Sequence, residues 1–172
     1  MANADFEGRV YPANAPYSVG SEKIREFAGA VGQTHPAHHD LVAARGLGYP
    51  DLVAPPTFAV VVAQRAESQY ISDPAADIDF SRVVHADERF THHRPIVAGD
   101  ELTTVLHVDR IVSRGPISMV TTRCEIFALP EGIEEPDADA PGEPVATVTS
   151  TLAIRGEDAC AAPTSPPSPW AT

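Results

Sequence analysis

The chain has little of what several common functions require. Lys23 is its only lysine, and Lys and Arg together number 12 against 24 Asp and Glu, which gives a net charge of −12. Nucleic acids and anionic membranes attract clustered positive charge, so neither is expected as a partner. No apolar run approaches the ~20 residues that span a bilayer. The N-terminus has no positive segment followed by an apolar one, as a signal peptide has. We therefore expect a soluble cytoplasmic protein.

Cysteine is also scarce. The two cysteines are Cys124, in a strand-like segment, and Cys160, in a Pro-rich tail, so their positions do not suggest a disulfide framework. A length of 172 residues with 43% hydrophobic residues fits a single domain with its own core. We assign residues 1–156 to this domain. Residues 157–172, rich in Ala, Pro and Ser, are predicted to form a disordered tail.

Two helices are predicted in the first half of the chain. The first begins at Ser21, which can cap it, and ends at Gly32, with one apolar stripe between them made by Ile24, Phe27, Ala28 and Val31. A short helical turn is expected at 41–45. The second helix runs from Phe58 to about Gln69. Its first six residues are apolar on every side, which predicts a helix buried on most of its faces.

The second half of the chain alternates with a period of two residues. This pattern predicts half-buried antiparallel strands at 82–92, 101–113, 117–129 and 145–155. In the first of them, His85 and Asp87 are expected on one face and Glu88 on the other, as parts of cross-strand pairs. A buried helix followed by a long antiparallel sheet predicts an α+β domain in which the sheet wraps around the helix. Its open edge strands favour pairing into a dimer.

Two segments resemble one enzyme family. The segment Gly32-Gln33-Thr34-His35-Pro36-Ala37-His38 is similar to the Gly-Asp-x-Asn-Pro-x-His loop of enoyl-thioester hydratases. The segment Phe90-Thr91-His92-His93-Arg94-Pro95-Ile96-Val97-Ala98-Gly99-Asp100-Glu101-Leu102 is similar to a strand turn of MaoC-like dehydratases. Together they resemble the N-terminal-type MaoC domain, also described as a FAS1-like dehydratase domain. The resemblance implies a single hot-dog fold, an antiparallel sheet wrapped around a long central helix, that dimerises.

The family's chemistry, implied by this resemblance, is the dehydration of a (3R)-hydroxyacyl thioester or the reverse hydration of a trans-2-enoyl thioester. A carboxylate and an imidazole hold a water between them, and each transfers a proton. By position, Gln33 replaces the family's Asp, His38 matches its His, and His35 replaces its Asn. An amide neither gains nor loses a proton near neutral pH, so Gln33 is not competent in acid–base catalysis.

The turn before the second helix also departs from the family pattern. Ala54-Pro55-Pro56-Thr57 stands where the family has Ala-His-Gly, and proline has no N–H to stabilise an oxyanion. The chain resembles the UPF0336-type small proteins, which are similar to the non-catalytic subunit of actinobacterial heterodimeric (3R)-hydroxyacyl-ACP dehydratases. Both departures argue against a complete site on this chain, and in such heterodimers the partner subunit carries the catalytic pair. As the non-catalytic subunit, this protein would bind the acyl chain, with His35, Pro56, Thr57, Phe58 and Val61 as substrate-binding residues. For Phe58 and Val61, core packing is the alternative.

Two other functions remain open. One is a non-catalytic homodimeric protein that binds acyl thioesters, and the other is a self-sufficient hydratase that uses His38. In each case the ligand is acyl-ACP or acyl-CoA in fatty acid metabolism, no cofactor is expected, and the protein is a homodimer or a heterodimer with a catalytic hot-dog subunit. Arg82, Arg89 and Arg94 are candidate contacts for a phosphate.

A metal site is the remaining interpretation of the histidines. His35-x-x-His38 can place two imidazoles together, and His39 and Asp40 follow directly. His92 and His93 lie elsewhere in the sequence. Structural zinc usually takes four ligands, often including Cys, and neither cysteine is near this loop in the sequence. We therefore expect no metal.

Overall fold

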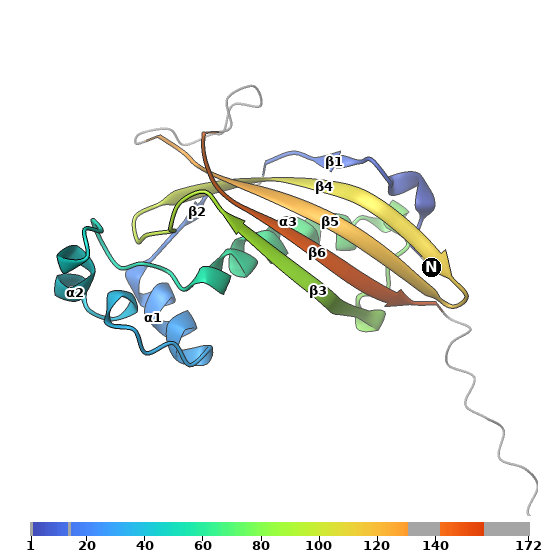
Figure 1. Ribbon diagram of the computed structural model, residues 1–172. Coiled ribbons are helices and arrows are strands. Elements are labelled where there is room, and N and C mark those ends of the chain that lie inside the picture. The colour runs from blue at the N-terminus through green and yellow to red at the C-terminus, as the bar shows by residue number, and fades with distance from the viewer. Residues whose placement is uncertain (1, 14, 131–141, 157–172) are drawn as a thin grey trace, which may run out of the picture.

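The structure is a computed structural model that describes residues 2–13, 15–130 and 142–156. One antiparallel sheet lies against a single long helix, α3, and two shorter helices lie beyond one end of the sheet (Figure 1). The helices are α1 (Ser21–Ala30), α2 (Leu41–Gly46) and α3 (Ala59–Ile71). The strands are β1 (Val10–Tyr11), β2 (Tyr17–Ser18), β3 (Val83–His92), β4 (Glu101–Arg114), β5 (Ile117–Ala128) and β6 (Glu143–Arg155). Short 3-10 helices are η1 (Ala4–Phe6), η2 (Pro36–His38), η3 (Pro56–Phe58), η4 (Pro74–Ala76) and η5 (Phe80–Arg82).

The strand order is β1-β4-β5-β6-β3, with β2 also paired to β4. Strands β3 and β4 follow each other in the chain, yet β5 and β6 lie between them in the sheet. In the part of the chain that the structure describes, β3 pairs only with β6 and is therefore an edge strand. This α+β arrangement and the four long strands confirm the prediction from sequence. The short strands β1 and β2 were not predicted, because two residues carry no measurable periodicity.

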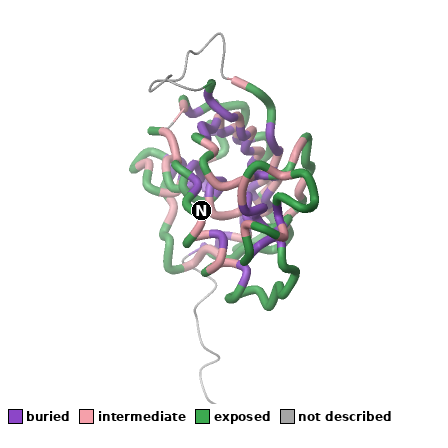
Figure 2. Tube along the Cα trace, turned by 90° about the vertical axis from the view of Figure 1, so that its left-hand side faces the viewer, coloured by how far each residue is buried: buried purple, intermediate pink, exposed green. Residues whose placement is uncertain are grey.

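The core lies between α3 and the sheet, where buried residues gather in the interior (Figure 2). None of the first five residues of α3 is exposed, as its apolar first turns predict, whereas Gln64, Arg65 and Ser68 further along the helix are exposed. The buried side chains on the sheet include Leu102, Leu106, Val120, Cys124, Val148 and Leu152. These positions alternate along their strands, as the predicted period of two requires. No helix among the described residues is both long and apolar enough to cross a membrane.

The start of α1 differs from the prediction. Gly20 occupies the N-cap with φ −84° and ψ 142°, and Ser21 is the first helical residue. The predicted cap at Ser21 is therefore wrong by one position. Its hydroxyl instead lies 3.4 Å from Asp51 Oδ1, to which it donates a hydrogen bond. Gly is itself accepted at the N-cap, so the helix begins there without a side-chain cap.

Strand β3 contains an irregularity that changes which side chains lie on the same face of the sheet, compared with the prediction from sequence. His85 pairs with Leu152 and Glu88 pairs with Ser150, and the register shifts between His85 and Asp87. Leu152 and Ser150 are both buried on the face that contacts α3. His85 and Glu88 therefore share this inner face, and Asp87 lies on the outer one. The prediction that Glu88 opposes His85 is wrong, because one extra residue in a bulge reverses the alternation.

Burial of Glu88 has a measurable consequence for stability. Desolvation raises the pKa of Glu88, the negative charge of Glu67 adds to the rise, and a hydrogen bond from Ser150 opposes it. A carboxyl whose pKa is raised on folding destabilises the native state as pH rises through that pKa. We expect Glu88→Gln to be more stable than the parent protein near neutral pH. Urea unfolding as a function of pH should show this advantage shrinking as the pH falls through the ordinary pKa range of glutamate. An advantage that is independent of pH would contradict the expectation.

Candidate functional site

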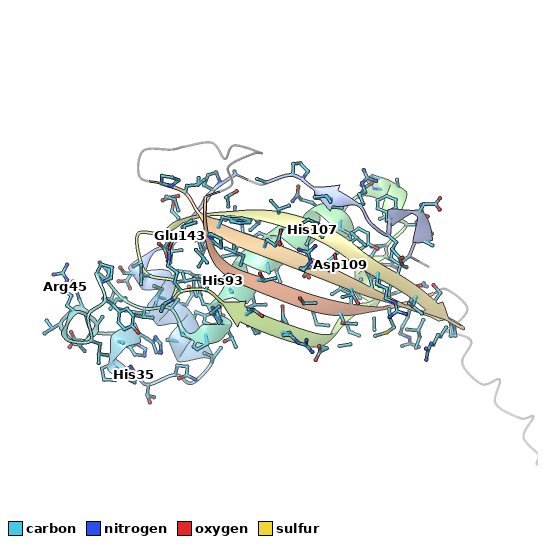
Figure 3. The ribbon with its side chains drawn as sticks, turned by 45° about the horizontal axis from the view of Figure 1, so that its top comes forward. His35, Arg45, His93, His107, Asp109 and Glu143 are labelled. Carbon is cyan, nitrogen blue, oxygen red and sulfur yellow. The ribbon has the colours of Figure 1, made fainter. Side chains whose placement is uncertain are left out.

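A cavity of about 600 Å³ lies where three segments meet. These are the connection between α1 and α2, the turn before α3, and the end of β3 with the residues that follow it. In Figure 3, His35 and His93 lie at this end of the molecule, whereas His107 and Asp109 lie on the sheet, away from it. The described residues that line the cavity are Gln33, His35, His38, Tyr49, Val53, Ala54, Pro55, Pro56, His92, His93, Arg94, Pro95 and Ile96.

Backbone hydrogen bonds hold two walls of this cavity together. The N–H of Ala54 donates to the carbonyl of Ile96 at 2.8 Å, and the N–H of Ala98 donates to the carbonyl of Leu52 at 2.9 Å. The turn before α3 is thereby tied to the turn that joins β3 to β4. The cavity is bounded by segments about 40 residues apart in sequence, held in register by these bonds.

The end of α1 sets the position of Gln33. Gly32 has a φ of +71°, and its N–H donates to the carbonyl of Gly29 at 3.2 Å. The N–H of Gln33 donates to the carbonyl of Ala28 at 2.8 Å. This pair of bonds is a Schellman motif, which requires a left-handed residue at Gly32. The stop predicted at Gly32 is confirmed. It turns the chain so that Gln33 enters the cavity wall directly after the helix.

His38 is the most buried imidazole of this site, with 8% of its surface exposed. It ends η2, and its Nδ1 lies 2.6 Å from the carbonyl oxygen of Val53. A carbonyl only accepts, so Nδ1 carries the hydrogen and Nε2 of the neutral ring keeps its lone pair. The tautomer is thus determined by a backbone group on the opposite wall. His38 is therefore held in the form in which Nε2 is able to accept a proton.

Two neighbouring histidines have structural contacts. His35 caps η2, because its Nδ1 accepts from the N–H of Ala37 at 3.2 Å, and its ring lies 5.8 Å from that of His38. His39 Nε2 lies 2.8 Å from the carbonyl oxygen of Gln33, so it donates there and braces the loop. In the described part of the chain, no group of three or more His, Cys, Asp or Glu is arranged to hold a metal ion.

The guanidinium of Arg94 is already engaged. Its Nη1 and Nη2 donate to both carboxylate oxygens of Asp100 at 2.9 and 3.0 Å, and its Nε donates to Glu143 at 3.0 Å. The hydrogen bond to Asp100 raises the pKa of Arg94. Asp100 also accepts from the N–H of Val97 at 2.9 Å, so it stabilises the turn before β4. Arg94 therefore has little capacity left for a ligand phosphate.

The chain matches the model of the FAS1-like dehydratase domain region over residues 5–128. It belongs to this family. A UPF0336 protein of Clavibacter michiganensis is 48% identical over 157 residues, which is 91% of this chain and 98% of the relative.

Solved structures agree with the family assignment. The chain superposes on a chain of the C-terminally truncated HadBC (3R-hydroxyacyl-ACP dehydratase) complex of Mycobacterium tuberculosis with a TM-score of 0.70 and 32% identity, covering 87% of this chain and 97% of that one. A double hot-dog protein of the same organism matches with a TM-score of 0.65 and 16% identity, over 90% of this chain and 40% of that one. The FAS1-like dehydratase domain of this protein has a hot-dog fold.

The structure brings together only some of the residues predicted for the catalytic positions or for substrate binding in this FAS1-like dehydratase domain. Gln33, His35, His38 and Pro56 all line the cavity. The other three do not. Thr57 follows Pro56 in η3, Phe58 is fully buried against Phe27 with ring centroids 5.3 Å apart, and Val61 is half-buried on α3. Arg82 pairs with Asp79 at 3.0 Å, and Arg89 lies on the outer face of β3.

Several lining residues were not predicted from the sequence to bind substrate, among them Tyr49, His92 and His93. Tyr49 follows α2, and the two histidines lie at the end of β3 and directly after it. The two histidines belong to the second segment of family resemblance, which was a signal for their position. The place of Tyr49 in the cavity wall depends on how α2 folds back onto the α1 connection.

Proposed function

We propose that this chain is the substrate-binding subunit of an (R)-specific 3-hydroxyacyl-thioester dehydratase, or enoyl-thioester hydratase. A catalytic hot-dog partner supplies the acid–base pair of carboxylate and imidazole. The acyl thioester, on CoA or on an acyl carrier protein, binds at the cavity that His38 lines. The chain contributes the walls and the groove for the acyl group, and the partner contributes the proton transfers.

One observation carries this proposal: no described residue that lines the cavity is Asp or Glu. The reaction needs one group that removes a proton from C2 and another that protonates the leaving hydroxyl. His38 is suited to one of these roles. Gln33 stands where the other would come from, and its amide does not titrate. The site supports binding of the thioester but holds only half of the acid–base pair.

The edge strand β3 supports the proposed partnership. It is ten residues long and open on one side in the described chain, and long open edges favour pairing with a second sheet. Val84 on this strand is a large apolar side chain that is exposed. The HadBC structure, a complex in which one chain is 32% identical to this one, supports a partner subunit for this chain.

A self-sufficient hydratase is the second candidate, and the state of His38 favours it. Because Nδ1 donates to the carbonyl of Val53, Nε2 of the neutral ring keeps its lone pair, and no Asp or Glu is among the described residues that line the cavity. In such an enzyme, Gln33 would orient the water, and His38 alone would carry the proton.

Hydration of a trans-2-enoyl-CoA by the purified chain tests the proposal. We expect no turnover above background from the chain alone. Turnover should follow when the chain is co-expressed with a hot-dog subunit from the same genome that has an intact Asp and His. In that complex, His38→Ala on this chain should change kcat by less than about threefold. Full activity of the isolated chain, lost in His38→Ala, would establish the second candidate instead.

A further inference from the structure

A buried carboxylate lies on α3, far from the site described above. Glu67 has 2% of its side chain exposed and is the only buried Asp or Glu among the described residues. It projects from the face of α3 that also carries Val60, Gln64 and Ile71, which are spaced as neighbours on a helix. An ionised carboxylate costs free energy when it leaves water, unless it gains partners. Its presence on the central helix therefore requires an explanation.

The partners of Glu67 come from two strands. Oε1 accepts a hydrogen bond from Thr122 Oγ1 at 2.7 Å, and Oε2 lies 3.2 Å from His85 Nε2. A carboxylate accepts, so Nε2 of His85 carries the hydrogen, and Nδ1 is left to bind another group. Glu88 lies on the same face of β3, where the bulge places both side chains. This polar cluster is defined by Glu67, His85, Glu88 and Thr122.

Two members of the polar cluster face a second cavity. His85 and Glu67 both line a space of about 950 Å³ between the last turns of α3 and the start of β3. His85 is 36% exposed, in contrast to Glu67, so the imidazole is the member of the pair that a ligand can reach. Apolar side chains supply part of the wall, and acidic ones supply much of the rest: Ile71, Ile78, Phe80, Val83, Asp73, Asp77 and Asp79.

The two cavities lie along the same pair of elements. The first borders the start of α3 and the end of β3, and the second borders the end of α3 and the start of β3. Pro56 and Glu67 are eleven positions apart, which is about 16 Å along a helix. Between the cavities, Val60 on α3 and Phe90 on β3 are half-buried apolar residues. An extended acyl chain advances ~1.3 Å per carbon, so about twelve carbons span this distance.

We infer that the polar cluster is a distal subsite that binds a hydroxyl group at the far end of an acyl chain about twelve carbons long. The inference rests on the proposed function, since the thioester end must lie at the His38 cavity. His85 Nδ1 accepts the hydroxyl hydrogen, and Glu67 holds the imidazole in the tautomer that makes this possible. The substrate class is then an ω-hydroxyacyl thioester of medium length.

The chemistry of the second cavity disfavours acyl chains that end in a methyl group or in a carboxylate. A terminal methyl would displace water from an imidazole without replacing its hydrogen bond, which costs affinity. A terminal carboxylate would meet Glu67 and the acidic side chains that line this cavity, and like charges repel. A hydroxyl is neutral and replaces the water. It therefore fits both the apolar wall and the polar end.

Binding of three CoA thioesters to the full chain tests the subsite by isothermal titration calorimetry. The ligands are 12-hydroxydodecanoyl-CoA, dodecanoyl-CoA and the mono-CoA thioester of dodecanedioic acid. We expect the hydroxy ligand to bind about tenfold more tightly than dodecanoyl-CoA, the effect of one net hydrogen bond. The carboxylate ligand should bind about tenfold more weakly than dodecanoyl-CoA. The His85 imidazole resonance in NMR, assigned with His85→Asn, should shift with the hydroxy ligand.

Variants at positions 85 and 67 distinguish binding at the distal subsite from binding of the thioester elsewhere on the chain. His85→Asn should remove the preference for the hydroxyl, and Glu67→Gln should weaken the rejection of the carboxylate while keeping the acceptor for Thr122. Asp87→Asn, on the outer face of the same strand, is the matched control and should leave all three affinities unchanged. Equal affinities for the three ligands in the parent chain would overturn the inference and leave the proposed function intact. No binding of any thioester would overturn both.

Discussion

Replacing Gln33 by Asp is expected to give the isolated chain a hydratase activity at least ~10²-fold above that of the parent. Gln33 and His38 line the same cavity, and His38 is held with Nε2 free. A carboxylate at position 33 would complete the pair that shares the water. General acid–base groups typically contribute 10²–10⁴-fold to a rate. The measurement is the initial rate of hydration of a trans-2-enoyl-CoA.

Gln33→Asn is the matched control for this experiment. Asn has the size of Asp but no titrating group, so it should give no gain. In the Gln33→Asp background, His38→Ala should return the rate to background, because the second member of the pair is then missing. A gain with Asn equal to that with Asp would show that the shape of the side chain, rather than its charge, limits the parent. No gain with Asp would mean that the Pro55-Pro56 turn withholds the oxyanion donors that the reaction also needs.

Phe58→Ala is expected to lower the free energy of unfolding by about 3–5 kcal/mol, the range for deleting a buried phenylalanine. Phe58 is fully buried at the start of α3. Its ring packs edge-on against Phe27 at 5.3 Å between centroids and lies 6.4 Å from Tyr17. These contacts join α3 to α1 and to β2. The residue was predicted from sequence either to bind substrate or to pack the core, and its surroundings favour packing.

Phe80→Ala is the matched control, because Phe80 has 72% of its surface exposed. Removal of an exposed side chain usually changes stability by no more than about 0.5 kcal/mol. Denaturant titration followed by circular dichroism measures both variants. A loss for Phe58→Ala as small as that for Phe80→Ala would show that the core tolerates a cavity at the start of α3. Phe58 would then be available for a role in binding.

The elements of secondary structure were largely predictable from sequence. The four long strands and the central helix follow from hydrophobic periodicity, which depends only on neighbours in the chain. The end of α1 was predictable for the same reason, since Gly32 is the residue that a left-handed turn accepts most readily. The facing of His85 and Glu88 was not predictable. A bulge is created by pairing with another strand, and the sequence of β3 alone carries no mark of it.

The candidate site was predicted in part. Gln33, His35 and His38 are neighbours in sequence, so their shared place in the cavity followed from the family loop. Tyr49 reaches the same cavity through the packing of α2. The binding roles assigned to Thr57, Phe58 and Val61 remain predictions, although these residues lie outside the cavity wall. The predicted tail at 157–172 and most of the loop before β6 lie outside the described residues.

By itself, the sequence determined the family, the order of the elements and the absence of a carboxylate at position 33. Each of these depends on the identity of residues or on local periodicity. Only the tertiary structure decided the tautomer of His38, because the carbonyl of Val53 that sets it belongs to another segment. The same is true of the contact between Glu67 and His85, which joins a helix to an edge strand. Contacts between distant segments depend on how the elements pack together, and the spacing of residues along the chain does not reveal this.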